Sequence, residues 1–157
     1  MIRIATPDDV SEILAMVVEL ATYEREPDAV TATAEDLRRA LFSEPTHVWC
    51  HLAEVNGEIA GMALWYLNFS TWQGKHGIYL EDLYVRPSHR GGGLGLALLR
   101  TLAQVAVSRD YGRVEWSVLD WNTPSIEFYR RVGAEPMDEW TTYRLSGAVL
   151  DDFGAHF

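Results

Sequence analysis

Four glycines within five positions follow an arginine in the second half of the chain, in the order Arg90-Gly91-Gly92-Gly93-Leu94-Gly95. Glycine lacks the Cβ atom that would keep an anion away from backbone N–H groups, and ordering it costs more entropy than ordering any other residue. The run precedes leucines at helical spacing, and the first N–H groups of a helix are unpaired donors at its positive end. We therefore expect this turn to bind an anion; the alternative is a flexible connector that is merely glycine-rich.

The pattern around these glycines narrows the class of anion. A P-loop ends in Gly-Lys-Ser/Thr, which is absent, and the dinucleotide pattern requires a third glycine where Leu96 stands. The dinucleotide pattern also belongs to the first strand–helix unit of its fold, whereas this turn comes late in the chain. The remaining pattern is Arg-x-x-Gly-x-Gly, from Arg90 to Gly95.

The histidines and the cysteine do not predict a metal site. The sequence has five histidines, His47, His51, His76, His89 and His156. Their spacing is not that of a close set of metal ligands. His47 and His51 would share one face of a strand, but no third ligand is evident. Cys50 is the only cysteine, which excludes an internal disulfide and suits a reducing cytoplasm. We expect Cys50 to be a small core residue rather than a nucleophile.

Composition excludes several partners. With 13 Lys and Arg against 23 Asp and Glu, the formal net charge is −10, which argues against nucleic acid. An acidic surface could steer a cationic substrate or serve only solubility. No apolar run approaches the roughly 20 residues that span a membrane. The first residues turn polar at Asp8 and Asp9, so we expect no secretory signal and a cytoplasmic protein.

Hydrophobic periodicity and turn residues predict the order of elements. We expect strands over 2–5, 48–55, 58–69, 77–85, 114–119 and 141–146. We expect helices from Thr6 to about residue 25, from Thr33, from the glycine turn to about Arg109 before Gly112, and from Asn122 to Arg131 before Gly133. Asn56-Gly57 favours a two-residue hairpin turn. This order indicates one domain over 1–157, with helices packed on a mixed sheet.

Two segments resemble the GNAT acetyltransferase superfamily. The string Arg90-x-x-Gly93-x-Gly95, preceded by the strand 79–85, is similar to the superfamily's coenzyme A signature. The string Asn122-Thr123-Pro124-Ser125-x-x-Phe128-Tyr129-x-x-x-Gly133-Ala134 is similar to its second cofactor segment, at the family's spacing. Segments 78–82, 72–75, 23–24 and 121–125 further resemble the spermidine/spermine branch, which includes diamine and thialysine N-acetyltransferases.

This resemblance implies an α/β fold class, with a twisted, mostly antiparallel mixed sheet of six to seven strands and about four helices. It implies acetyl-coenzyme A as co-substrate, no metal, a small-molecule primary amine as acceptor in a ternary complex, and a homodimer. Backbone at Leu83, Tyr84 and Val85 would hold the pantetheine arm and the acetyl carbonyl. The diphosphate would lie on Arg90, Gly91, Gly92, Gly93, Leu94, Gly95 and Leu96, with further cofactor contacts from Asn122 and Ser125.

The resemblance also implies a catalytic pair, Glu81 and Tyr129. An alkyl ammonium has a pKa near 10.4 and must lose a proton before it attacks a thioester. Glu81 could take that proton, directly or through water, and burial would improve it as a base. Tyr129 could protonate the departing thiolate at a cost of only about 2 kcal/mol. The alternatives are a structural acid at Glu81 and core packing at Tyr129.

The acceptor site is less well specified. The resemblance implies that Tyr23, Glu24 and Trp72 join Glu81 there, where an aromatic ring and a carboxylate could hold a cation. Tyr23 could equally end a core stripe, and Glu24 could be a solvated charge. Arg25 and Pro27 depart from the branch, and an arginine there would oppose a polycation and favour an acceptor with a carboxylate. Polyamine acetylation is therefore open.

Two other functions remain alternatives. The first is acetylation of a protein N-terminus or lysine, which would require an open groove. The aromatic loop from Phe69 to Trp72 could close such a groove. The second is an acyl-coenzyme A sensor without catalysis, against which the presence of both Glu81 and Tyr129 argues.

Overall fold

The computed structural model describes residues 1–155, and residues 1–119 form a mixed sheet with helices on both faces. The sheet order is β1-β2-β3-β4-β5, with antiparallel neighbours except for the parallel pair β4 and β5. The strands are β1 (Ile2–Ile4), β2 (Val48–Val55), β3 (Glu58–Ser70), β4 (Lys75–Val85) and β5 (Val114–Glu115). The expected α/β mixed sheet is confirmed.

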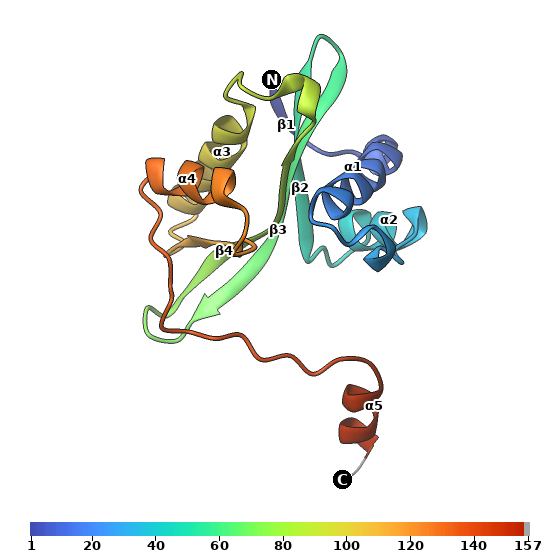
Figure 1. The fold of residues 1–157 in the computed structure, drawn as a ribbon, viewed down its shortest axis with the longest axis vertical. Helices are drawn as coiled ribbons and strands as arrows, with labels where there is room; N and C mark the ends of the chain where they lie inside the picture. Colours follow the sequence, from blue (N-terminus) through green and yellow to red (C-terminus); the bar gives the residue numbers. More distant parts are fainter. Residues whose placement is uncertain (156–157) are drawn as a thin grey trace. The chain divides into compact units, whose positions relative to one another are not determined.

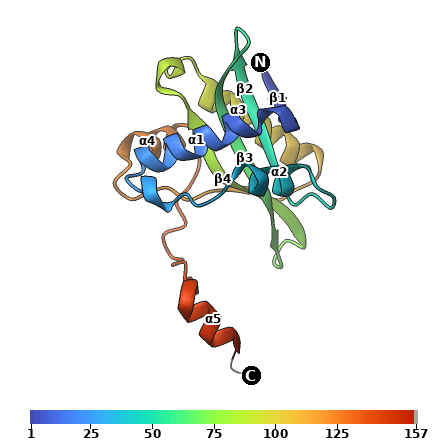
Figure 2. The same ribbon diagram turned by 90° about the vertical axis from the view of Figure 1, so that its right-hand side faces the viewer.

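Five α-helices and three short 3-10 turns complete the described residues. The helices are α1 (Val10–Tyr23), α2 (Ala34–Phe42), α3 (Leu94–Ser108), α4 (Thr123–Arg131) and α5 (Gly147–Ala155). The 3-10 turns are η1 (Pro7–Asp9), η2 (Pro27–Ala29) and η3 (Pro87–His89). Helices α1 and α2 cover one face of the sheet and α3 covers the other (Figure 1). Figure 2 views the sheet through α1, with α3 behind it.

The expected strand count was too high by at least one. Five strands are present among residues 1–155; the stretch 141–146 is not one of them, and 114–119 is paired only over Val114–Glu115. The stretch 141–146 has β-forming residues, but a strand exists only when a neighbour completes its hydrogen-bond ladder. Helix α5 was not expected, and His156 lies outside the described residues.

Local signals placed most helix ends correctly. Thr33 caps α2 by accepting from the Asp36 N–H at 3.2 Å, and the Asp36 carboxylate accepts the Thr33 N–H at 2.9 Å. Helix α3 ends at Ser108, with Asp110 in the left-handed region at φ 57°. Gly112 therefore does not end the helix. An added Cβ at Gly112 would meet the end of the flexible Gln73 side chain, which would have to move aside.

The hairpin between β2 and β3 turns at Asn56 and Gly57, as expected. Both residues have positive φ, 51° and 82°, and Val55 pairs with Glu58 across the turn. A β-bulge between Ala53 and Glu54 then shifts the pairing by one residue, so that Leu52 lies opposite Met62, and both are buried together with Ile13 of α1. The main core on this face of the sheet thus depends on the turn and the bulge together.

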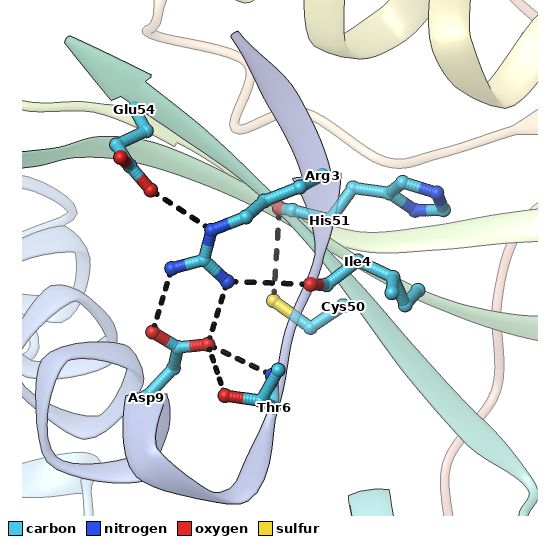
Figure 3. Close-up of polar contacts among 7 residues, drawn as sticks. All are labelled: Arg3, Ile4, Thr6, Asp9, Cys50, His51 and Glu54. Carbon is cyan, nitrogen blue, oxygen red and sulfur yellow. Dashed lines mark hydrogen bonds and ion pairs between the residues drawn. The ribbon is translucent and has the colours of Figure 1, made fainter. Parts of the chain in front are cut away.

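Arg3 joins three segments near the N-terminus (Figure 3). Its Nε donates to Glu54 of β2 at 2.9 Å, and its two Nη atoms donate to Asp9 at 2.8 and 2.9 Å. Asp9 also accepts the backbone N–H of Thr6 at 2.8 Å. The bonds from Arg3 lower the pKa of Asp9 to about 2, and those from Thr6 add to this. The network fixes how the chain passes from β1 into α1.

Cys50 lies in the core under α1, with 1% of its surface exposed. Burial raises the pKa of its thiol to about 12, with the nearby carboxylates of Asp9 and Asp82 adding to the effect. The thiolate, which is the reactive form, is therefore scarce at neutral pH. The expectation that Cys50 is a core residue is confirmed.

The described residues pack as two compact units, residues 1–119 and residues 120–155. The first holds the whole sheet with α1, α2 and α3. The second holds α4 and α5. The expected single domain over 1–157 stays a prediction.

Candidate active site

The glycine turn adopts a conformation that only glycine tolerates well. Gly91 and Gly93 have φ of 83° and 82°, and Gly93 is the N-cap of α3. An added Cβ at either position would meet no atom within 4 Å, so the space beside the turn is open. Glycine is therefore required by the left-handed backbone, and the open space beside it would let an anion approach the main chain.

The amides at this end of α3 are available as donors. Ala97 is the first residue to donate along the helix, to the carbonyl of Gly93 at 2.9 Å. Within residues 1–155, the N–H groups from 91 to 96 donate to no backbone carbonyl in a turn, loop or cap. They stand at the positive end of a 15-residue helix. The turn can thus hold an anion with main-chain groups alone.

The strand that leads into this turn has an open edge. In the described part of the chain, β5 pairs with β4 only at Ile78 and Tyr79. The Arg86 N–H donates toward β3, to Ala60 at 2.8 Å, so the peptide groups of Val85 face away from β3 by strand alternation. Within the described residues no strand pairs with β4 on that side from Leu83 to Val85, where the Val85 carbonyl accepts from the Arg90 Nε at 2.8 Å. Tyr84 is buried and its main-chain groups face β3 by the same alternation, so its expected contact with the cofactor stays a prediction.

Glu81 occupies a β-bulge. Asp82 pairs with Leu64 and Leu80 pairs with Trp65, which leaves Glu81 without a partner on β3. Its side chain is exposed. Bulges disturb strand alternation and redirect side chains, and they are common beside active sites. The sequence gives no sign of this extra residue, because a bulge depends on how two strands pair.

Three carboxyl groups influence one another around this bulge. Burial raises the pKa of Asp82 to about 6, with the charges of Glu81 and Glu24 adding to the effect. Burial also raises the pKa of Glu24, again with help from Glu81. Tyr66 is affected in the same way, because burial and then the Glu81 carboxylate raise its pKa. Such a cluster favours a bound cation, and it contains a carboxyl group that titrates near neutral pH.

Asp82 and Tyr66 were missed by sequence reasoning. Asp82 adjoins Glu81 in the chain, but regular alternation would send adjacent side chains to opposite faces of the sheet. The bulge removes that rule at this point. Tyr66 pairs with Tyr79 across β3 and β4, and their rings lie 5.2 Å apart. The one available signal was the pair of acids before Leu83.

The end of α1 meets the glycine turn through Arg90. The guanidinium carbon lies 5.5 Å from the Tyr23 ring centroid and 5.6 Å from that of Tyr84. The Arg90 Nε donates to the Val85 carbonyl at 2.8 Å. Tyr23 and Glu24 are thus brought to the carboxyl cluster and the turn. The guanidinium is directed at the strand end, while the N–H groups that follow it are left open.

Trp72 is not brought to this cluster within the described residues. It lies in the turn between β3 and β4 and is 90% exposed. Lys75, where β4 begins, is six residues before Glu81, which corresponds to roughly 20 Å along a strand. A role for Trp72 beside the acceptor stays a prediction.

The second unit contains the other predicted site residues. Asn122 caps α4, its side chain accepting from the Ser125 N–H at 3.4 Å, and Pro124 stands in the first turn. Gly133 follows the helix at φ 87°, as expected. Tyr129 lies in the last turns of α4, with its ring 5.5 Å from that of Phe128. The roles of Asn122, Ser125 and Tyr129 stay predictions.

No metal site and no membrane span is found in the described part of the chain. Among residues 1–155 no three His, Cys, Asp or Glu side chains are arranged to hold a metal ion. No helix in that range is both long and apolar enough to cross a membrane. The expected absence of a metal stays a prediction.

Comparison with known proteins gives consistent relatives. The sequence profile of the acetyltransferase (GNAT) family matches residues 12–134. The chain is 36% identical over 161 residues to thialysine N-epsilon-acetyltransferase of Bos taurus, covering 96% of this chain and 94% of the relative. It is 37% identical over 151 residues to the enzyme of that name from Caenorhabditis elegans, covering 94% and 92%. An integron cassette protein from the mobile metagenome of V. cholerae superposes with a TM-score of 0.82 at 27% identity, covering 98% and 96%.

Proposed function

The chain belongs to the acetyltransferase (GNAT) family, and from that premise we propose that it transfers the acetyl group of acetyl-coenzyme A to a primary amine of a small molecule. The observation that carries this proposal is the open cradle of amides at the head of α3, beside the open end of β4. The same strand presents Glu81 and Asp82. A diphosphate-bearing thioester and a cationic acceptor suit these two features.

The cofactor would be held mainly by main-chain groups. The amides of the turn, from Gly91 through Gly92, Gly93, Leu94 and Gly95 to Leu96, would receive the diphosphate. The open edge of β4 from Leu83 to Val85 would pair with the amide groups of the pantetheine arm. An N–H on that edge would also stabilise the negative charge that develops on the acetyl oxygen. Asn122 and Ser125 would add contacts from the start of α4.

The carboxyl pair at the bulge would prepare the acceptor. The ammonium form, with a pKa near 10.4, would be attracted by Glu24, Glu81 and Asp82. One proton would pass to the pair, through Glu81 directly or by way of water, and the neutral amine would then attack the thioester carbonyl. A carboxyl group whose pKa is about 6, such as Asp82, retains a proton better than an ordinary carboxylate.

Tyr129 would complete the reaction as general acid. After attack, the C–S bond breaks and the electron pair leaves with the coenzyme A sulfur. The phenol would donate its proton to that thiolate, and the amide product would lose its extra proton to the carboxyl pair. Proton donation from a group of pKa near 10 to a thiolate of pKa near 8.5 costs only about 2 kcal/mol.

The acceptor would be a lysine-like amino acid rather than a polyamine. Relatives with 36% and 37% identity over nearly the full chain are named thialysine N-epsilon-acetyltransferases. The carboxyl cluster suits the side-chain ammonium. Arg25, which directly follows Glu24, would repel a polycation and attract a carboxylate.

The active form would be a cytoplasmic homodimer that needs no metal, nucleic acid or membrane. Large apolar side chains in the second unit are exposed in the single chain, among them Trp140 (68%), Tyr143 (93%) and Phe153 (65%). Exposed apolar side chains in such numbers favour burial against a partner. Sedimentation of the full chain tests this, since a monomer at micromolar concentration would contradict it.

Free-thiol release from acetyl-coenzyme A tests the function. We expect release with thialysine, lysine or ornithine, and slower release with spermidine and short diamines. Mass spectrometry of the product should show one added acetyl group on the side-chain nitrogen. Coenzyme A binding without turnover on any small amine would instead favour a sensor, and turnover restricted to peptides would favour a protein acetyltransferase.

A further inference from the structure

Arg90 contacts three parts of the candidate site at once. It begins the glycine turn, its Nε donates to the Val85 carbonyl at 2.8 Å, and its guanidinium lies 5.5 Å from the Tyr23 ring centroid. The ring of Tyr84 stands at 5.6 Å from the same guanidinium carbon. One side chain thus links the cofactor turn, the open strand end and the last residue of α1.

A different arginine holds the rest of α1 against the sheet. Arg86 pairs with Glu12 at 2.9 Å and with Glu19 at 3.2 Å. These contacts fix the first part and the middle of the helix. Tyr23 lies a full turn beyond Glu19 and is 39% exposed. The contact with Arg90 links this end of α1 to the cofactor turn.

The chemistry of the arginine side chain suits this role. A guanidinium is charged at every relevant pH, is planar, and can lie against aromatic rings while donating hydrogen bonds in its plane. Lysine has a compact charge on a flexible stem and cannot do both at once. Any ligand that orders the backbone from Gly91 onward also orders Arg90, because the two are adjacent in the chain.

We propose that Arg90 is a positioning residue that couples the two substrate sites, so that cofactor binding at the turn orders Tyr23 and Glu24 for the acceptor. This inference rests on the proposed function and extends it. A bound diphosphate would fix the turn, the turn would fix Arg90, and Arg90 would fix the end of α1. Acceptor affinity would then rise when the cofactor is present, and by linkage cofactor affinity would rise with the acceptor.

Calorimetry measures this coupling with coenzyme A and the best acceptor of the unmodified enzyme. We expect the acceptor to bind roughly fivefold more tightly in the presence of coenzyme A. In Arg90→Gln and Arg90→Lys, the ratio of the acceptor Kd without coenzyme A to the acceptor Kd with it should fall to nearly one. The KM for the acceptor should rise roughly fivefold at saturating acetyl-coenzyme A. Each variant is measured at a coenzyme A concentration that saturates it, so that a change in its own cofactor Kd does not enter the ratio. Arg100→Gln, an exposed arginine on α3, is the matched control and should change neither quantity.

A double-mutant cycle separates coupling from a general loss of structure. If Arg90 acts through Tyr23, then Tyr23→Leu should remove the same coupling, and the double variant should be no worse for the acceptor than Tyr23→Leu alone. The inference would be overturned if the double variant lost acceptor affinity by the product of the two single losses. It would also be overturned if coenzyme A still strengthened acceptor binding in Arg90→Lys. An unmodified enzyme that acetylates no amine refutes the proposed function instead, whereas an active enzyme without coupling refutes only the role of Arg90. Should Arg90→Gln fail to fold, the Tyr23→Leu and Arg90→Lys measurements still decide.

Discussion

At the scale of single residues, Glu81 and Asp82 show how adjacent carboxyl groups can differ in function. Glu81 is exposed in the bulge, whereas Asp82 is partly buried, and burial raises its pKa to about 6. A partly buried carboxylate beside two others destabilises the fold when it is ionised. Residues at active sites often lower the stability of the fold because activity requires them.

Asp82→Asn should stabilise the protein above pH 6 and slow catalysis. The folded-state pKa of Asp82 is raised from 3.8 to about 6, so the folded state prefers the protonated acid. Ionised Asp82 therefore costs nothing below pH 3.8, costs progressively more between 4 and 6, and costs its full amount of roughly 2 to 3 kcal/mol above that range. The variant should unfold about 5 °C higher at pH 7.5 and show no gain at pH 4. Thermal unfolding at both values checks this, with the exposed Asp28→Asn as control.

Tyr129→Phe should lower kcat while leaving cofactor affinity almost unchanged. The substitution removes only the phenolic proton donor, and general acid catalysis contributes roughly 100-fold or more. The ring, with its neighbour Phe128, remains for packing. Steady-state kinetics together with coenzyme A calorimetry separates the two effects. An unchanged kcat would mean that another group protonates the sulfur.

At the scale of elements, the turn before α3 begins a helix and yet leaves the first amides of that helix open. In ordinary helices a capping side chain occupies those amides. A good N-cap side chain would occupy the first amides, and it would block an anion. Gly93 leaves them open at the expense of capping. This end of α3 therefore lacks a side-chain cap, and its first amides stay open to the anion that we propose.

Gly93→Val should abolish coenzyme A binding, whereas Gly57→Val should not. Both glycines have φ of 82° with nothing within 4 Å of an added Cβ, so the two substitutions carry the same backbone strain. They differ in location, because Gly57 lies in the hairpin turn between β2 and β3, whereas Gly93 is the N-cap of α3. Calorimetry on both variants, with thermal unfolding to match their stability losses, distinguishes a blocked cradle from a general defect. If both variants lost coenzyme A affinity equally, the glycine turn before α3 would not be the binding site.

At the scale of the whole molecule, two carboxyl groups shift stability in opposite directions with pH. Asp82 favours the folded state when protonated, and Asp9 favours it when ionised. Their joint effect makes the fold most stable near pH 4, because Asp9 has reached its full contribution there and the cost of ionised Asp82 has only begun to grow. The Arg3 network that holds Asp9 also joins β1, β2 and α1, so it acts on the fold rather than on the site (Figure 3).

Asp9→Asn should lower stability at pH 5 and have little effect at pH 2. The pKa of Asp9 is lowered from 3.8 to about 2, so its stabilising contribution is complete above pH 4 and disappears as the pH falls through 2. Because the ion pair is partly open to water, the contribution is about 1 to 2 kcal/mol. Urea unfolding across this range measures it. Arg3→Gln should give the same pH dependence, and a loss that persists at pH 2 would point to packing instead.

Local signals in the sequence predicted much of this fold and part of the site. Turn residues such as Asn56 and Gly57, the cap at Thr33 and the glycines before α3 act through neighbouring residues, so they can be recognised in the chain. The bulge at Glu81 and the raised pKa of Asp82 arise from strand pairing and burial, which no short segment encodes. The stretch 141–146 was mistaken for a strand because propensity does not supply a partner.

The open border of β4 also has a consequence outside catalysis. Unpaired main-chain groups along a strand invite a foreign strand to add to them, which is how many soluble proteins begin to aggregate. A nucleotide thioester lying along Leu83 to Val85 would cover that border and shield it. The proposed acyl donor would then also protect the protein against aggregation. Protein without ligand should become turbid sooner on warming than protein stored with coenzyme A.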